Sequence, residues 1–533
     1  MAGFIYRFGT ERPDASGSEG KAHALSLHSH MTLFYNEGTV TRVTDGDDSV
    51  TVLGYACKPD CCLETYLSGW LENFTVGRIG EMKRELLGQY AVVVYKAGFF
   101  YLFSDFLQTR SIYYDPEGKT VGTSFRAVRP SPMSEPDEYK VFEFLAMRHC
   151  QYPAWLGNTT LDRRVKRLRP WEYLNLDSRT GAMEAIGIEL QIDNTRITSL
   201  KEVTNRTLTV LREAVRHPAM RESRVESTLT GGFDSRLVTA LVQEYYPETG
   251  LRTAVWNGRE SLDHDVAMRV ASAFSLPLCV YRSDPDARPE AFYAMTEGLV
   301  PRENAIITPI LENVDYGVLG FGGSYGTELY SPLAYADGDS LIAGYVDRAR
   351  KFVPANEAYY ERFEEALRLE LERIERHYPL ACPDGRDVLR LFRLINTACF
   401  SAPIVSAFNI RGRQYEVFGT FPVIEAGLKI PYEYLGGKHT FGRFYLIPKH
   451  IMEQIAPKAA KIATTHFCPM RPLSLSSFVS YATGRLTRSR YYKRQAKFRT
   501  GKTKRLFLER EHLRYASGEW FEGFLLEYLR TEA

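Results

Sequence analysis

The sequence predicts an α+β domain with an antiparallel β-sandwich, followed by an α/β domain with a parallel sheet and a helical C-terminal part. The chain has 533 residues, and single hydrophobic cores stop growing at roughly 250–300 residues. Up to about residue 190, short strand-like segments alternate apolar and polar residues, whereas strand-like and helical segments interleave after it. We therefore expect two domains, at residues 1–192 and 198–533.

Composition narrows the class of protein. Hydrophobic residues make up 44% of the chain and charged residues 25%, which is typical of a globular protein and argues against disorder. The formal charge of +2 gives no reason to expect nucleic acid or membrane as a partner. No segment approaches the roughly 20 apolar residues of a spanning helix, and the N-terminus lacks a signal-peptide core. We expect a cytoplasmic protein.

Three of the eight cysteines, Cys57, Cys61 and Cys62, lie close together in the sequence. No nearby His or paired CxxC supplies a fourth ligand for a structural metal. We therefore expect reduced thiols at these positions.

In the first domain, strands are predicted in MTLFYN, SVTVLGYA, YAVVVYKAGFFYLFSD and TVGTSF, between Gly, Asp, Asn and Pro turns. The pattern from Leu63 to Leu87 is helical. Further strand-like residues at 171–192 close this domain. These segments together predict an antiparallel layer with helices on it.

The second domain opens with a helix to about His217, for which Ser199 is the N-cap and Glu202 is in the capping-box position. Strand-like runs (STLT, TAVWN, LPLCVY, YGVLGF) then alternate with helical ones, which is typical of βαβ units. From residue 355 onward the pattern is mostly helical and includes Glu357–His377.

The segment STLTGGFDSRLVTAL, residues 227–241, predicts a strand, a glycine loop and a helix. Adjacent glycines let backbone amides converge on an oxyanion at a helix N-terminus. The hydroxyls of Thr230 and Ser235 can add donors, whereas Asp234 suits a phosphate only if Mg²⁺ stands between them. The alternative is a plain βα turn, in which Gly231 and Gly232 allow tight packing and Asp or Ser caps the helix.

The loop at 230–235 resembles the SGGxDS loop of N-type ATP pyrophosphatases, with Thr230 in place of the first Ser. Three further segments resemble asparagine synthetases: DHDVAMRVASAFSLPL, VLGFGGSYGTELY and EVFGTFPVIEAGLKIP. The resemblance implies a HUP-like ATP-pyrophosphatase fold that uses ATP and Mg²⁺. It implies that ATP contacts eight residues, Leu229, Thr230, Gly231, Gly232, Asp234, Ser235, Val255 and Gly323.

Aligning Gly326 with that family's second loop places Tyr325 where a catalytic Glu usually stands, and Glu328 where a Mg²⁺-binding Asp stands. The resemblance thus implies that Asp234 and Glu328 hold Mg²⁺. A tyrosine at the position of Tyr325 is similar to β-lactam synthetases, where it helps deprotonate an amine; the alternative is that it packs on adenine or lines the cleft. For the basic residue on pyrophosphate, Arg443 and Lys461 are candidates, with Lys449 and Lys458 as rivals.

Residues 87–128 resemble the core of a class II glutamine amidotransferase, which implies an Ntn-like fold for the first domain. In that family the mature chain begins with a nucleophilic Cys, whereas Ala2 stands at this position here. We therefore expect no glutaminase activity. Two branches of the asparagine synthetase superfamily with a similarly disabled domain, the β-lactam or carbapenam synthetases and the lasso-peptide cyclases, close a ring with an amine of the substrate.

The expected function is thus an ATP-dependent, amide-forming ligase that adenylates a carboxylate, with a small-molecule or peptide substrate, a peptide precursor among the candidates. An ammonia-dependent asparagine synthetase-like enzyme and a non-catalytic nucleotide-binding scaffold remain alternatives, and tRNA modification is a third. Residues 485–505 carry ten Lys or Arg and no acid, which fits an acidic partner or a solvated face. Residues 335–395 can shape an acceptor pocket or a dimer contact.

Overall fold

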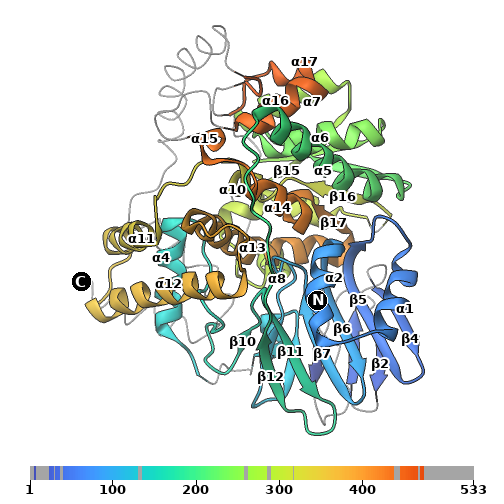
Figure 1. Ribbon diagram of the computed structural model, residues 1–533, viewed down its shortest axis with the longest axis vertical. Helices are drawn as coiled ribbons and strands as arrows, with labels where there is room; N and C mark the ends of the chain where they lie inside the picture. The colour runs from blue at the N-terminus through green and yellow to red at the C-terminus, as the bar shows by residue number, and fades with distance from the viewer. Residues whose placement is uncertain are drawn as a thin grey trace.

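The computed structural model describes residues 40–129, 135–256, 262–284, 290–315, 317–436, 445–465 and 469–472, with the backbone of three strands before residue 40. Met1, Ala2, Arg443 and the basic segment 485–505 lie outside the described residues. Figure 1 shows antiparallel strands at one end of the molecule and a parallel sheet with its helices at the other.

The N-terminal part (residues 1–192) contains a six-stranded antiparallel sheet in the order β12-β11-β7-β6-β5-β4. Its strands are β4 (Val40–Asp45), β5 (Asp48–Cys57), β6 (Leu87–Lys96), β7 (Phe99–Ser104), β11 (Glu172–Asp177) and β12 (Met183–Gly187). A four-stranded antiparallel sheet has the order β1-β9-β8-β10, formed by Ile5–Arg7, Thr120–Gly122, Tyr113–Asp115 and Lys166–Arg167. A separate pair joins β2 (His23–His28) to β3 (Met31–Tyr35).

Alternation along β6 explains how this sheet is covered on both faces. Ala91, Val93 and Tyr95 pack in one apolar cluster with residues of β8 and β9. Tyr90, Val92 and Val94 pack in another cluster with the helices α1 (Leu63–Glu72) and α2 (Ile79–Glu85). Because successive side chains of a strand point to opposite faces, one strand contributes to both cores.

The helical pattern predicted from Leu63 to Leu87 is only partly right. It is broken after α1, where Asn73 is the C-cap, and resumes in the short 3₁₀ turn η1 (Val76–Arg78) and in α2. Thr75 adopts an extended backbone, and Leu87 already belongs to β6. The β-branched Thr75 after the Asn-Phe pair explains the break, since these residues have low helix propensity.

The C-terminal part (residues 198–533) contains a five-stranded parallel sheet in the order β15-β14-β13-β16-β17. Its strands are β13 (Val225–Thr228), β14 (Gly250–Trp256), β15 (Leu278–Ser283), β16 (Leu319–Gly322) and β17 (Arg413–Glu416). The helices α5 (Leu200–Met220), α6 (Asp234–Tyr245) and α7 (Leu262–Phe274) alternate with these strands. The predicted N-cap is confirmed, because the Ser199 hydroxyl accepts a hydrogen bond from the Glu202 N–H at 3.3 Å.

The rest of the described chain is largely helical, as predicted, and Glu357–His377 is one continuous helix, α12. The remaining helices are α3 (Phe125–Val128), α4 (Glu138–Cys150), α8 (Glu290–Thr296), η2 (Arg302–Ile307), α9 (Thr308–Glu312), α10 (Gly326–Tyr330), α11 (Gly338–Phe352), α13 (Gly385–Arg411), η3 (Val417–Gly419), α14 (Phe421–Leu428), α15 (Tyr432–Leu435), α16 (Leu446–Ile455) and α17 (Pro457–Ala460).

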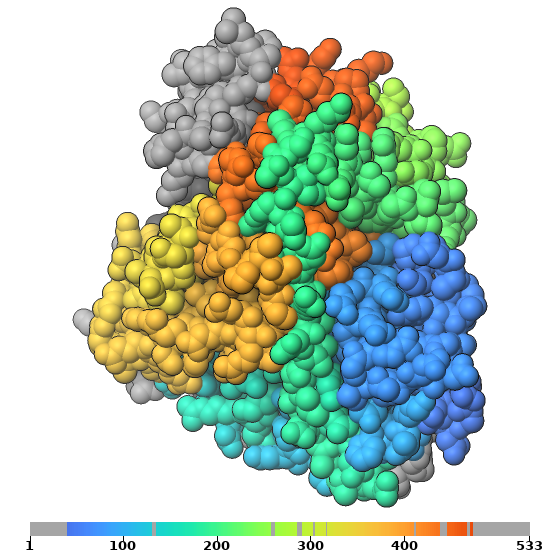
Figure 2. All heavy atoms as spheres, viewed as in Figure 1, coloured from blue at the N-terminus to red at the C-terminus, as the bar shows by residue number. Residues whose placement is uncertain are grey.

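The two parts are in direct contact. The N–H of Leu190 donates to the carbonyl of His377, and the His377 ring stacks on Trp171 at 5.4 Å between centroids. Figure 2 shows the green stretch before residue 200 lying between the blue N-terminal part and the orange helices. One apolar cluster contains buried residues of both parts. The helices α11 and α12, within the 335–395 segment, pack against α4 of the N-terminal part.

Within the described residues, Gly385–Asn409 of α13 is the one helical stretch long and apolar enough to cross a membrane, and 67% of its most apolar window is buried inside the protein.

Candidate functional site

Two loops meet at the carboxyl ends of β13 and β16. These strands pair in parallel, with Ser227 opposite Phe321, so that the loops following them emerge side by side. A β-carbon added to Gly323 would lie 2.7 Å from the backbone nitrogen of Ser235, and one added to Gly326 would lie 2.5 Å from Asp234 Oδ1. Glycine at both positions therefore lets the second loop, residues 322–327, pack directly on the first.

The first loop, residues 229–235, is held by its own hydroxyl groups. The Thr230 N–H donates to Ser235 Oγ at 3.0 Å, and the two hydroxyl oxygens lie 2.9 Å apart. The Gly232 N–H donates to Thr230 Oγ1 at 3.3 Å. Leu229 is buried, and its N–H pairs with the carbonyl of Arg252. The loop thus has a defined shape, with α6 starting directly at Asp234.

Two distant segments also reach Gly231. Asp263, in the first turn of α7, accepts the Gly231 N–H at 3.0 Å, and the Thr465 N–H donates to the Gly231 carbonyl at 3.1 Å. Burial raises the pKa of Asp263, although the bond from Gly231 opposes this shift. The Asp263 carboxylate therefore occupies the Gly231 N–H, which lies in the loop that the family resemblance expects to bind pyrophosphate.

Asp234 faces the second loop. Its Oδ2 accepts the Thr327 N–H at 3.0 Å and the Thr327 hydroxyl at 2.9 Å. The Tyr445 hydroxyl lies 2.6 Å from Thr327 Oγ1, and its ring stacks on Phe233 at 4.5 Å between centroids. Burial raises the pKa of Asp234 to about 7; the bonds from Thr327 oppose this rise, and the charge of Glu328 adds to it.

Glu328 lies in the first turn of α10 and is buried. Burial raises its pKa, while the positive charge of Arg393 and a hydrogen bond from Thr397 lower it. The charge of Glu328 thus acts on Asp234 at the junction of the loops. Among the described residues, no group of three or more His, Cys, Asp or Glu side chains could hold a metal by itself.

Tyr325 adopts a left-handed backbone with φ of 77°, which is unusual for a bulky residue, and it caps α10. Its phenol is buried, with the hydroxyl 2.6 Å from Ser401 Oγ on α13. Burial, together with the charge of Glu416, raises its pKa well above its ordinary value. The Tyr325 phenol is therefore protonated in this conformation, and its hydroxyl is hydrogen-bonded to Ser401 inside the protein.

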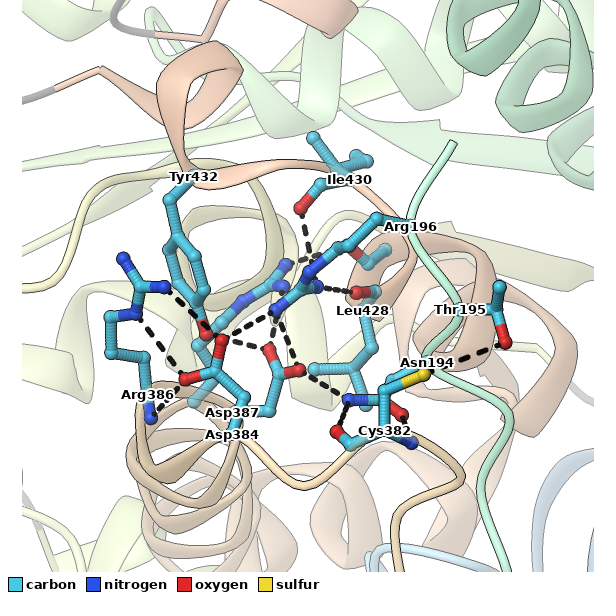
Figure 3. A network of polar contacts seen from close by, with 12 residues as sticks. Asn194, Thr195, Arg196, Cys382, Asp384, Arg386, Asp387, Leu428, Ile430 and Tyr432 are labelled. Atoms are coloured by element: carbon cyan, nitrogen blue, oxygen red, sulfur yellow. Dashed lines mark hydrogen bonds and ion pairs between the residues drawn. The ribbon is translucent and has the colours of Figure 1, made fainter. Parts of the chain in front are cut away.

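A network of polar contacts surrounds Asp387 of α13 (Figure 3), and Arg390 of the same helix joins it to α10. The buried Arg390 donates to the carbonyls of Leu329 and Gly427, at 2.6 and 2.7 Å. It also pairs with Asp387 at 3.4 Å. Asp387, itself fully buried, accepts hydrogen bonds from three further side chains, those of Asn194, Arg196 and Tyr432. The stretch joining the two parts is therefore connected to the helix that carries Glu328.

Two other predicted site residues, Val255 and Lys461, lie in separate parts of the C-terminal part. Val255 is buried in β14 beside β13. Lys461 follows α17 with an exposed side chain. The carbonyl of its neighbour Ile462 accepts a hydrogen bond from Arg236 of α6 at 2.6 Å.

Sequence reasoning missed Thr327 and Tyr445 as partners of Asp234, and Glu416 as a partner of the second loop. Glu416 Oε2 accepts the Ser324 N–H at 2.9 Å. Tyr445 carries no local signal, because it reaches the loop only through tertiary packing. Asp263 was visible as the acid in the DHDVAM segment, but its bond to Gly231 was not predictable.

Residues 206–310 match the family model for asparagine synthase, which supports a relationship to the asparagine synthetase superfamily. Among solved structures, the chain is similar to glutamine phosphoribosylpyrophosphate amidotransferase from B. subtilis complexed with ADP and GMP, at 10% identity and a TM-score of 0.19, covering 60% of this chain and 65% of that one. It is also similar to the allosteric regulatory enzyme of purine biosynthesis, at 11% identity and a TM-score of 0.18, covering 60% of this chain. The chain thus spans 65% and 64% of the length of these two structures. Curated protein sequences give no match.

Proposed function

We propose that this chain is an ATP- and Mg²⁺-dependent ligase that joins a carboxylate to an amine and releases AMP and pyrophosphate. The observation that carries the proposal is the meeting of Asp234 and Glu328 where the two loops pack together at the carboxyl edge of the parallel sheet. The asparagine synthase match, which includes the first loop, supports an ATP-dependent, amide-forming ligase in general.

The donor set fits magnesium bound together with a nucleotide. Mg²⁺ is usually held by one or two carboxylates plus substrate phosphates. The raised pKa values of Asp234 and Glu328 reflect burial, and at Asp234 also the charge of Glu328. A divalent cation would relieve that repulsion. Asp234 and Glu328 would hold Mg²⁺, which when bound offsets the charge of the departing pyrophosphate.

The first loop would bind the pyrophosphate end of ATP. Its hydroxyls, from Thr230 and Ser235, and its backbone amides are suited to oxyanions at the start of α6. Because Asp263 occupies the Gly231 N–H, this carboxylate must move away before a phosphate oxygen can accept from that donor. Nucleotide binding should therefore be accompanied by a shift of the first turn of α7.

The amine is proposed to come from the substrate itself or from another donor than glutamine, in peptide or natural-product biosynthesis. The resemblance of this chain to β-lactam synthetases and lasso-peptide cyclases supports this choice. Ammonia-dependent amide formation is the alternative within the ligase class. For Tyr325 we propose a positioning role in the present conformation, because its hydroxyl is engaged by Ser401.

The test is ATP–pyrophosphate exchange in the presence of candidate carboxylates, with the native chain, Asp234→Asn and Glu328→Gln. Both variants should lose exchange by at least about a hundredfold, since charge stabilisation of the leaving group is lost. Asp315→Asn is the matched control, because Asp315 is exposed and pairs with Arg224 near the opposite edge of the sheet. Equal exchange in all four proteins would contradict the assignment of the site.

A nucleotide-binding scaffold without catalysis is the second candidate. Two observations favour this candidate. Asp263 occupies the Gly231 N–H, which a ligase would need for phosphate, and the Tyr325 hydroxyl is buried against Ser401, where it cannot reach a substrate amine. Binding of ATP without exchange, for every carboxylate offered, would select this alternative.

A further inference from the structure

The side chain of Gln89, on β6 of the N-terminal part, pairs with the backbone of Glu416 at the end of β17. Gln89 Oε1 accepts the Glu416 N–H at 2.8 Å, and Gln89 Nε2 donates to the Glu416 carbonyl at 3.2 Å. Both residues are buried. The amide of Gln89 thus satisfies both backbone groups of Glu416, which would otherwise be left without partners in a buried interface.

The carboxylate of Glu416 in turn holds the second loop. Its Oε2 accepts the Ser324 N–H at 2.9 Å, and its Oε1 accepts from Gln414 Nε2 at 2.9 Å. Gly322 allows this approach, because an added β-carbon would collide with the carboxylate. Ser324 directly precedes Tyr325 and Gly326. The chain of contacts therefore runs from β6 through Glu416 to the loop that carries Glu328.

A second glutamine of the N-terminal part reaches the other side of the same site. Gln151, at the end of α4, donates from Nε2 to the Arg393 carbonyl and to Thr397 Oγ1, each at 2.9 Å. The Thr397 hydroxyl in turn makes a side-chain hydrogen bond with Glu328. The neighbouring Tyr152 ring stacks on Phe400 at 4.8 Å between centroids.

We propose that Gln89 and Gln151 are positioning residues through which the N-terminal part sets the geometry of the nucleotide site, an inference that rests on the proposed function. Gln89 acts through Glu416 on the start of the second loop, and Gln151 acts through Thr397 on Glu328. The N-terminal part then serves the ligase site directly, whether or not it has chemistry of its own.

The same interface offers a matched control. Arg221, the C-cap of α5, donates to Cys57 Sγ at 3.2 Å and to the carbonyls of Pro59 and Cys61 at 3.0 and 3.1 Å. It also joins the two parts, but it precedes β13 and therefore lies at the opposite edge of the sheet from the loops. Arg221→Met should weaken the contact between the parts without touching the site.

The experiment measures the affinity for a non-hydrolysable ATP analogue with Mg²⁺ by isothermal titration, and the Tm, for the native chain, Gln89→Met and Arg221→Met. Gln89→Met keeps the side-chain length and removes both hydrogen bonds. We expect it to weaken the affinity about tenfold, because the loop loses its support. Arg221→Met should lower the Tm about as much as Gln89→Met does. Its affinity for the ATP analogue should stay within about twofold of that of the native chain.

A double-mutant cycle separates positioning from general destabilisation. If Gln89 acts through Glu416, its substitution should have little further effect on affinity in the Glu416→Gln background. Should Gln89→Met not fold, Gln89→Asn, which keeps a neutral amide but is one methylene shorter and so withdraws it from Glu416, takes its place in the same comparison. Native affinity in the Gln89 variant, or an equal loss in Arg221→Met, would overturn the inference. No binding by the native chain would instead remove the proposed function, and the inference with it.

Discussion

At the scale of single residues, the Asp234 carboxylate lies among groups that oppose its ionisation. Burial and the charge of Glu328 raise its pKa to about 7, although Thr327 donates two hydrogen bonds to it. Glu328 is pushed in the same direction by its own burial. A pair of carboxylates in this setting is typical of cation sites and of other functional sites.

This raised pKa predicts how stability depends on pH. Between the ordinary pKa of 3.8 and about 7, the folded state binds the Asp234 proton more tightly than the unfolded state does. The contribution of Asp234 to the free energy of unfolding is therefore largest near pH 4 and declines as pH rises through 7. Asp234→Asn should remove this decline in metal-free urea denaturation between pH 4.5 and 8, with the slope kept in Asp315→Asn. Identical pH slopes in the native chain and Asp234→Asn would contradict the pKa shift.

The buried hydroxyl of Tyr325 makes a second residue-scale prediction. Tyr325→Phe removes the hydrogen bond to Ser401 and leaves the ring in place, and should lower the free energy of unfolding by about 1 kcal/mol. Ser401→Ala should cost a similar amount, and the double variant should cost less than the sum, as measured by chemical denaturation. Fully additive effects would show that the two hydroxyls do not interact.

At the scale of elements, Arg390 joins α10 to the polar network around Asp387, and Figure 3 shows the contacts of Asp387. Both side chains are fully buried, and removal of one partner leaves a buried charge uncompensated. This arrangement explains how a helix of one turn can hold Glu328 in a defined place.

Asp387→Ala should therefore lower the free energy of unfolding by about 3 kcal/mol or more, because the buried Arg390 loses its carboxylate and Arg196 keeps only Asp384. Arg206→Ala is the control, since Arg206 is exposed on α5 and its pairing with Glu202 should contribute less than about 1 kcal/mol. Chemical denaturation measures both changes. A similar small loss in both variants would contradict the importance of the buried network.

The elements that could be predicted from the sequence are those with strong local patterns. The cap at Ser199, the charged helix Glu357–His377 and the strand–loop–helix at Asp234 all follow from capping, periodicity and glycine chemistry. The strand β17 was missed because its residues, RQYE, form no apolar run and it lies at the edge of the sheet. The break between α1 and α2 was missed because apolar periodicity resumes directly after it.

At the scale of the whole molecule, one apolar cluster contains residues from both parts, and Gln89, Gln151 and Arg221 bridge them with hydrogen bonds. The strand–loop–helix that carries Asp234 could be predicted from the sequence, whereas the partners of Asp234 could not. Thr327, Asp263 and Tyr445 meet around Asp234 and Gly231 only through tertiary packing, which a sequence pattern does not encode.

The shared core predicts that the two parts unfold together. Differential scanning calorimetry should show one transition, with the van't Hoff enthalpy close to the calorimetric enthalpy. Arg221→Met should shift this transition to lower temperature without splitting it. Two well-separated transitions in the native chain would contradict the coupling of the parts.

The central claim is that Asp234 belongs to a working Mg²⁺–nucleotide site. Isothermal titration of the native chain and Asp234→Ala with a non-hydrolysable ATP analogue, with and without Mg²⁺, tests it most directly. We expect metal-dependent binding with a Kd in the micromolar range, on the order of −8 kcal/mol, that the substitution abolishes. No binding by the native chain, or equal binding by both proteins, would contradict it.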